Sequence, residues 1–268
     1  MRASQLPAVA GVLRQGLALV AFALAAPVWA DAPHPWVTES PRLEKNAYFS
    51  NLKSGDVVDS PFVVKFGLSG IGIAAVSRPV AHTGHHHLMI DRELPLDFTQ
   101  PLPFNDQYVH FGKGQMEAVV DLPAGPHAFR LVFADDKHIP NFVYSDVLNI
   151  EVRGPSGRNK AELTRPSVDI LTPADGARLV PPFLLGLHAS GFNVSHTDIK
   201  DDNTGHFRVK LQTAEGKTEV ITLADGRTQV WLNPPPGTYS VGVELVSNAQ
   251  PARSLGVAPS RRLTVSGR

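Results

Sequence analysis

Four of the eleven histidines in this sequence lie within six positions, between His82 and His87. Neutral imidazole is a good ligand for zinc, copper and nickel, so this clustering points first to metal chemistry. The segment continues into Leu88-Met89-Ile90, and this apolar run predicts that the histidines stand at the start of a strand. Alternate side chains of a strand share one face at a spacing of ~6.6 Å, so His85 and His87 can direct their rings at one ion.

Two imidazoles are too few to hold a metal ion, so a further ligand must come from another segment. The histidine candidates are His82, His110 and His138, and the carboxylate candidates are Asp91, Asp135 and Asp136. The alternative for His85 and His87 is a polar strand face in contact with solvent. For His138 the alternative is an exposed position in a polar loop.

The rest of the sequence favours short strands joined by turns. The chain contains 23 prolines and 22 glycines, and 43% of its residues are hydrophobic while only 7% are aromatic. Apolar or alternating runs at residues 62–66, 116–122, 129–133 and 147–152 are separated by turn-forming residues. We therefore predict an all-β protein.

An internal repeat divides the chain into two domains. A shift of 121 positions aligns eight identical residues without a gap, among them Thr83-Gly84-His85 with Thr204-Gly205-His206, and a shift of 112 aligns Gly125 with Gly237. The second copy is therefore nine residues shorter, and the loss falls around the loop that begins at Arg92. The predicted boundaries are 48–153 for the first domain, 154–166 for a linker and 167–268 for a degenerate second domain.

Two domains of about 100 residues, each with some seven short strands, fit tandem immunoglobulin-like β-sandwiches. The Gly237-Thr238-Tyr239 segment at the start of a strand resembles the tyrosine corner of such sandwiches, in which the tyrosine hydroxyl holds a loop. His127 aligns with Tyr239, so we expect it to take over that role. A small barrel is the alternative architecture.

The second copy serves as an internal control for the histidine strand. Apolar residues at alternate positions of residues 206–211 are expected to face the core. By the same alternation His86 points to the core, while His85 and His87 point away from it. The second copy has Asn203, Phe207 and Arg208 in place of His82, His86 and His87, so a site built on these histidines belongs to the first domain. His188 and His196 have no histidine counterpart in the first copy and are expected at the surface.

The first thirty residues predict export. Arg2 and Arg14 precede an apolar run that is too short for a membrane span, and Pro27-Val28-Trp29-Ala30 follows it, as in a secretory signal peptide. The alternative is a retained anchor helix. Residues 31–47 are expected to form an extended arm on the first domain, with His34 in a loop. The mature protein is then periplasmic and has no membrane span.

Charge and cysteine content exclude several classes of partner and ligand. Without residues 1–30 the chain has 23 basic against 25 acidic residues, so no nucleic-acid partner is expected. The chain has no cysteine, which excludes disulfides, thiolate metal ligands and lipoprotein acylation. No phosphate loop or serine nucleophile elbow is present, and no organic cofactor is expected.

Two segments of the first domain are distinctive in combination, Thr83 to Leu88 and Phe111-Gly112-Lys113-Gly114-Gln115. With residues 60–67, 123–127 and 135–140, they resemble the bacterial family defined by domain of unknown function 4399. The resemblance covers residues 48–153, and the second domain resembles a degenerate copy. It implies an exported protein in which these histidines, His127 included, are family features, and it implies no particular activity.

Three hypotheses follow for the function. In the first, the protein binds one divalent transition metal, copper(II) or zinc, through His85 and His87 together with His82, His110 or His138. In the second, it is a metal-free module of the cell envelope that uses its sandwich faces and the loop at residues 92–105 to bind a protein or a polymer. In the third, three histidines and a water hold a catalytic metal with an open position.

Overall fold

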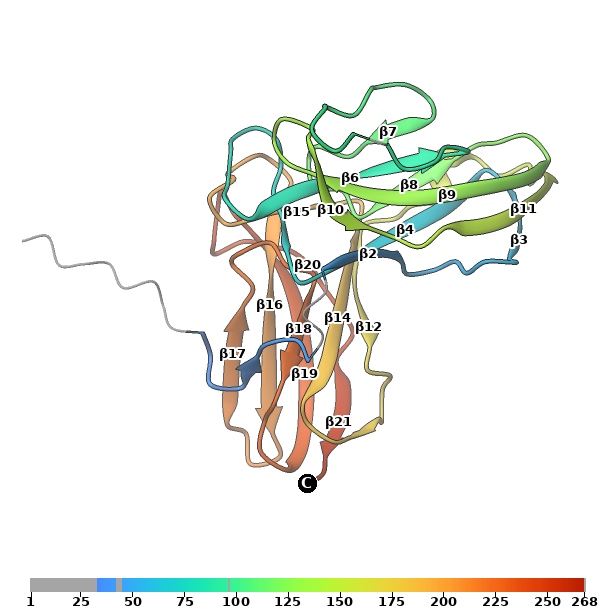
Figure 1. Cartoon of the computed structure of the whole chain (residues 1–268). Helices are drawn as coiled ribbons and strands as arrows, with labels where there is room; N and C mark the ends of the chain where they lie inside the picture. Colours follow the sequence, from blue (N-terminus) through green and yellow to red (C-terminus); the bar gives the residue numbers. More distant parts are fainter. Residues whose placement is uncertain (1–32, 42–44, 96, 268) are drawn as a thin grey trace, which may run out of the picture. The chain divides into compact units, whose positions relative to one another are not determined.

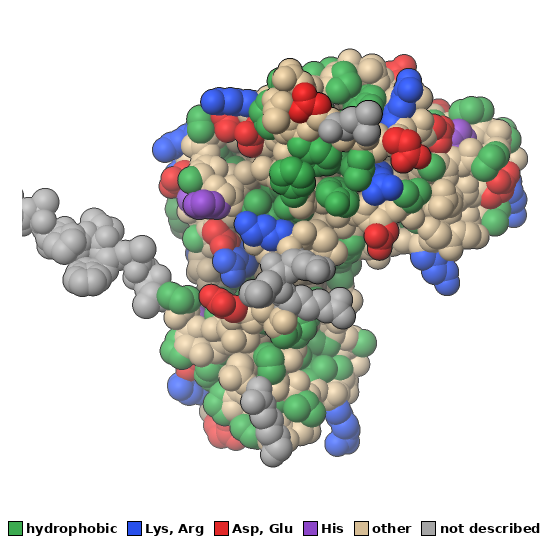
Figure 2. Space-filling view, in the orientation of Figure 1, with side chains coloured by type: hydrophobic (Ala, Val, Ile, Leu, Met, Phe, Trp, Pro, Cys, Tyr) green, Lys and Arg blue, Asp and Glu red, His purple; other side chains and the backbone are tan. Residues whose placement is uncertain are grey.

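The computed structural model describes residues 33–41, 45–95 and 97–267, and the predicted signal peptide lies outside them. Regular structure in these ranges is β-strand, apart from one turn of 3-10 helix, η1 (Lys160–Glu162). No helix in the described part of the chain is long and apolar enough to cross a membrane. Basic and acidic side chains are interspersed over the face shown in Figure 2.

The first sandwich consists of a three-stranded and a seven-stranded sheet (Figure 1). The smaller sheet has the order β2 (Asn46–Phe49), β4 (Phe62–Ser69), β8 (Glu117–Val120). The larger sheet has the order β3 (Val57–Ser60), β11 (Leu148–Pro155), β9 (Gly125–Ala134), β6 (Thr83–Ile90), β5 (Gly72–Ile73). Two further strands extend it, β10 (Pro140–Tyr144) on β9 and β7 (Tyr108–His110) on β6.

The second sandwich repeats this arrangement. Its smaller sheet has the order β1 (Val37–Thr38), β18 (Gln229–Leu232), β14 (Phe183–Ser190), β12 (Ser167–Thr172). Its larger sheet has the order β13 (Arg178–Leu179), β21 (Arg261–Val265), β19 (Gly237–Ser247), β16 (Thr204–Thr213), β15 (Asn193–Val194), with β17 (Thr218–Thr222) on β16 and β20 (Ser254–Val257) on β19. The predicted class of tandem immunoglobulin-like sandwiches is confirmed.

The repeat extends to register and backbone conformation. Gly72 pairs with Thr83 in the first sandwich, and Asn193 pairs with Thr204, 121 positions later, in the second. The turn residue before the central strand is left-handed in both copies, with φ of 58° at His82 and 57° at Asn203. Asparagine and histidine are among the non-glycine residues that tolerate this conformation best.

Alternation along β6 sets its two faces as predicted. His86, Leu88 and Ile90 are buried with Phe66, Phe129 and Phe133 between the sheets. In β16, Phe207, Val209 and Leu211 are fully buried, and Lys210 is exposed. Both faces of β6 are buried, however, because a second layer of chain covers its outer face.

Two expectations for positions outside the cluster are wrong. The arm does not lie on the first sandwich over its first part, because β1 pairs with β18 of the second, Val37 opposite Leu232. His188 is fully buried rather than at the surface, and its Nε2 lies 3.3 Å from Glu117 Oε2, across the contact between β14 and β8. Both are contacts between segments far apart in sequence, which the pattern of a single strand cannot reveal.

Candidate metal centre

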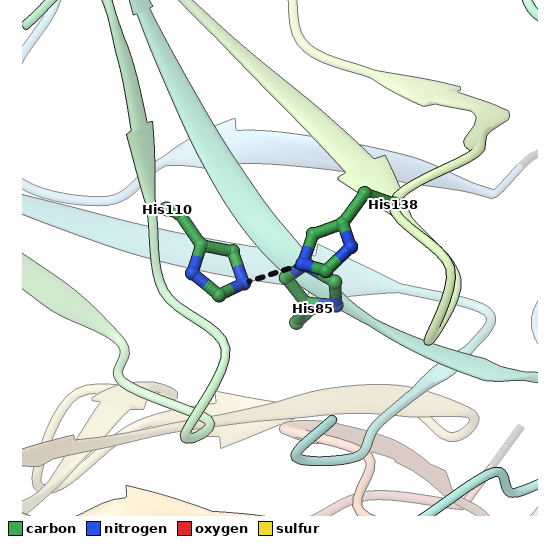
Figure 3. Close-up of side chains that lie close together, drawn as sticks. All are labelled: His85, His110 and His138. Atoms are coloured by element: carbon green, nitrogen blue, oxygen red, sulfur yellow. Dashed lines mark hydrogen bonds between the residues drawn. The ribbon is translucent and has the colours of Figure 1, made fainter. Parts of the chain in front are cut away.

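Four imidazole rings meet on the outer face of β6. The Nε2 atoms of His85 and His87 lie 2.8 Å apart, and those of His110 and His138 lie 3.2 Å apart. The ring centroid of His85 is 4.7 Å from that of His110 and 5.1 Å from that of His138. Figure 3 shows the rings of His85, His110 and His138 coming together from three separate segments of backbone.

Strand pairing and one tight turn position these rings. His87 on β6 is paired directly with His110 on β7. His138 lies in the turn between β9 and β10 with φ of 65°, and its N–H donates to the carbonyl of Asp135. The Asp135 carboxylate in turn accepts hydrogen bonds from two N–H groups later in the same turn. The carboxylate therefore serves to close the turn that presents His138.

The outer face is buried by the segment between β6 and β7, where the first copy is longer than the second. The Leu102 N–H of this segment donates to the His138 carbonyl at 2.9 Å. The Leu102 side chain packs with Met89 in a small apolar cluster that is separate from the main core. His85 and His87 are consequently 0% exposed. The alternative of a solvated polar face is thereby excluded for these two residues.

Two residues shape the edge of the cluster. The Phe104 side chain is 60% exposed, and its ring lies 4.8 Å from that of His110 and 4.9 Å from that of His138. It thus stands between the imidazoles and solvent. Gly112 leaves room for the His110 ring, because a Cβ atom at this position would collide with the imidazole.

Burial keeps the inner histidines neutral. It lowers the pKa of His85 to about 2 and that of His87 to about 3, and repulsion from the neighbouring imidazoles contributes to both shifts. The pKa of His110 is also lowered, by burial and by His138. A neutral imidazole keeps the lone pair that a metal ion needs, so protons do not compete for these ligands near neutral pH.

The arrangement fits a metal ion. One nitrogen from each of His85, His110 and His138 lies within 4.8 Å of the others. Tetrahedral zinc with bonds of 2.0–2.1 Å separates its nitrogen ligands by ~3.3 Å, which the His110–His138 pair already approaches. The Nδ1 atoms of His85 and His87 are buried, and neither has a hydrogen-bond partner among the described residues.

The other predicted ligands lie elsewhere. The structure places His82 outside the cluster, in an exposed turn that lines a separate hollow with Asp136. Asp91 is 2.8 Å from His127 Nδ1 and accepts a hydrogen bond from the Ala128 N–H. Within the described ranges, no carboxylate forms an ion pair with the four clustered histidines. The site therefore offers nitrogen ligands alone.

The remaining histidines of the first sandwich have structural positions. His86 is buried between Phe66 and Phe133, and neither of its ring nitrogens has a partner among the described residues. His127 Nε2 lies 3.0 Å from the carbonyl oxygen of Pro123, four residues earlier, just as the Tyr239 hydroxyl donates to the Pro235 carbonyl, also four residues earlier. This contact is the one expected from the corner alignment.

Phe104 lies in the predicted loop at residues 92–105, and Gly112 belongs to one of the two segments that carry the family resemblance. No sequence pattern indicates that either residue touches the imidazoles, and only the folded chain shows these contacts. The Tyr108-Val109-His110 alternation was a usable signal for β7, because it has the period of a strand with His110 on the same face as Tyr108.

A comparison with known protein families gives a match within the first sandwich. Residues 64–153 match the family described as Domain of unknown function (DUF4399). The match ends within β11, the last strand of this sandwich, and includes all four clustered histidines. A search of curated proteins finds no significant match.

The solved structures that match this chain are distant from it. Fibronectin(III)-like modules of Clostridium thermocellum CbhA share 10% identity, with 83% of this chain and 94% of that chain covered and a TM-score of 0.26. Dimeric latent PorU from Porphyromonas gingivalis shares 10% identity, with 83% and 20% covered and a TM-score of 0.30. The FN1-FN3 domains of chicken CNTN1 share 10% identity, with 82% and 64% covered and a TM-score of 0.23.

Proposed function

We propose that this chain is a periplasmic protein whose DUF4399 domain binds one copper(II) or zinc ion through His85, His110 and His138, with His87 as a fourth ligand. The observation that carries the proposal is the convergence of imidazoles from three segments onto one point, where burial keeps His85 neutral. Histidines without a common ligand have no reason to be gathered where burial and mutual repulsion both oppose their charged form.

The donor set favours borderline metals. Imidazole nitrogen suits zinc and copper, whereas calcium and magnesium require oxygen ligands, which the clustered residues do not supply. Met89 is not proposed as a thioether ligand. It lies beyond His87 on β6, where it packs in the apolar cluster with Leu102. Among metals of similar affinity, availability in the compartment decides which one occupies such a site.

Binding would tie together three segments of the domain. The ligands come from β6, from β7 and from the turn between β9 and β10, so an ion that holds them also fixes the segment between β6 and β7. An ion that binds only the folded chain stabilises it by mass action, by about 4 kcal/mol at a thousandfold excess over Kd. The proposed role is therefore metal handling together with stabilisation of this part of the domain.

The test is elemental analysis and calorimetry on the full chain, produced without a histidine tag and stripped of metal beforehand. We expect one equivalent of copper(II) or zinc to bind. The double variant His110→Ala/His138→Asn should weaken binding by at least about 100-fold, since even outer contacts of a metal ligand are worth 10–100-fold. Asparagine is chosen at position 138 because it tolerates the left-handed conformation found there.

The matched control is His82→Asn. Asn203 occupies the equivalent position of the second copy with nearly the same φ, so this change removes a neighbouring histidine without altering the turn. Its metal affinity should equal that of the natural chain. Absence of tight binding in the natural chain, or equal affinity in the double variant, would refute the proposed function.

A further inference from the structure

An exposed aromatic stack joins β10 to the segment between β6 and β7. Phe142 is 81% exposed, and its ring stacks on that of Phe98, with centroids 4.9 Å apart and planes inclined by 7°. Tyr144, two residues further along the strand, is 40% exposed, and its ring is 6.3 Å from that of Phe98. Figure 2 shows hydrophobic side chains gathered over this part of the molecule.

Two hollows adjoin the stack. The first, of about 690 Å³, is lined by residues that include His82, Asp136 and Asn141. The second, of about 650 Å³, is lined by residues that include Asn46, Tyr144 and Asp146. Phe142 and Lys45 line both, so the two hollows are neighbours that share the aromatic ring. Each has the volume of a typical small-ligand site.

Polar groups around the ring are free to bind. In the described ranges no side-chain hydrogen bond or ion pair involves Asp136, Asn141, Asp146, Asn46 or Lys45. Together they offer carboxylate and amide oxygens as acceptors, and amide and ammonium groups as donors. Positive and negative groups are both present, so the hollows do not select for a strongly charged ligand.

We propose that this surface binds an uncharged, β-linked oligosaccharide, with Phe142 as the stacking platform. A pyranose ring has an apolar face of C–H groups and a rim of hydroxyls. The apolar face can lie on an exposed aromatic ring, while the hydroxyls need donors and acceptors at the side, which is the combination found here. Two adjoining hollows on either side of one ring accommodate successive sugar units.

A folded protein partner fits this surface less well. A stable protein interface needs about 800 Å² from each partner, with a continuous apolar centre. Here the exposed apolar surface is a small stack, and it is interrupted on both sides by hollows with unpaired polar groups. A glycan fills such hollows with hydroxyls, whereas a protein would have to place side chains of its own in both.

The test is calorimetry of the full chain with tetramers of β1,4-linked N-acetylglucosamine and of β1,4-linked glucose, together with affinity electrophoresis in the matching soluble polysaccharides. We expect at least one tetramer to bind. Phe142→Ala should weaken binding by about tenfold or more, since tenfold corresponds to the loss of one well-stacked ring. Because the side chain is mostly exposed, the melting temperature should change little.

Val257→Ala is the matched control. Val257 is 65% exposed on β20 of the second sandwich and lines neither hollow, so this change removes an exposed apolar side chain that is not part of the proposed site. It should leave glycan binding unchanged, and so should His110→Ala in metal-free protein. The proposal is overturned if neither tetramer binds at millimolar concentration, or if Phe142→Ala binds as tightly as the natural chain. Loss of binding in the His110 variant would equally overturn it, because the glycan would then depend on the metal centre.

Discussion

Replacing His86 by phenylalanine should remove part of the acid sensitivity of the metal-free protein. His86 is fully buried between Phe66 and Phe133, and the second copy has Phe207 at the same place in its core. Burial lowers the pKa of His86 from its ordinary value of 6.5 to about 3. The unfolded chain therefore takes up a proton well before the folded chain does.

The sign and size of the effect follow from this difference. A lowered pKa in the folded state means that stability is highest above pH 6.5 and falls as the pH drops from there toward 3. Between pH 6.5 and pH 5, protonation of this histidine stabilises the unfolded chain by about 1.4 kcal/mol per pH unit. His86 alone therefore lowers the unfolding free energy by about 2 kcal/mol at pH 5. Phenylalanine has no such dependence.

Urea denaturation of metal-free protein at pH 7 and at pH 5 measures the effect. The loss of unfolding free energy between the two pH values should be about 2 kcal/mol smaller in His86→Phe than in the natural chain. Any change in packing shifts both measurements alike and cancels in this comparison. The reverse change, Phe207→His, should make the unfolding free energy fall more steeply between pH 7 and pH 5, because it buries a histidine in the second sandwich. Equal losses in His86→Phe and the natural chain would refute the reasoning.

Three further predictions concern the edge of the cluster and the corner. Gly112→Ala should push the His110 ring aside and weaken metal binding at least tenfold in calorimetry, with little change in melting temperature. The control is Gly242→Ala, where an added Cβ meets no atom within 4 Å, and this variant should bind metal as tightly as the natural chain. Phe104→Ala should open the cluster to solvent and speed metal release to a chelator in stopped-flow measurements, with the equilibrium affinity changed less. Burial lowers the pKa of His127, but the hydrogen bonds with Asp91 and with the Pro123 carbonyl, together with the charges of Asp91 and Glu151, outweigh burial and raise it. The stabilisation is therefore present below pH 6.5 and is lost as the pH rises through the higher pKa of the folded state. His127→Leu should therefore destabilise the protein more at pH 6 than at pH 8 in thermal unfolding, and the opposite order would contradict this assignment.

Local patterns in the sequence were enough to predict the long strands of the first sandwich and the two faces of β6. The side-chain period of a strand is two residues, so the alternation around His86 identifies its inward direction without knowledge of the rest of the fold. The repeat adds information of the same kind, because equivalent residues in two copies occupy equivalent turns. This explains why His127 and Tyr239 each form a hydrogen bond with the backbone carbonyl oxygen four residues earlier.

The membership and burial of the metal cluster depended on tertiary structure. His85 and His87 share a face by periodicity, but His82, His110 and His138 were equal candidates for the further ligand. In the folded chain His110 lies in the cluster because it pairs with His87, and His138 lies there because the turn between β9 and β10 presents it. His82 lies in another turn. The hydrogen bond between Leu102 and His138 and the contact of His188 with Glu117 likewise join segments far apart in sequence. A periodic pattern fixes the direction of a side chain relative to its own strand, whereas the neighbours it meets are set by chain closure and packing, which no local pattern encodes.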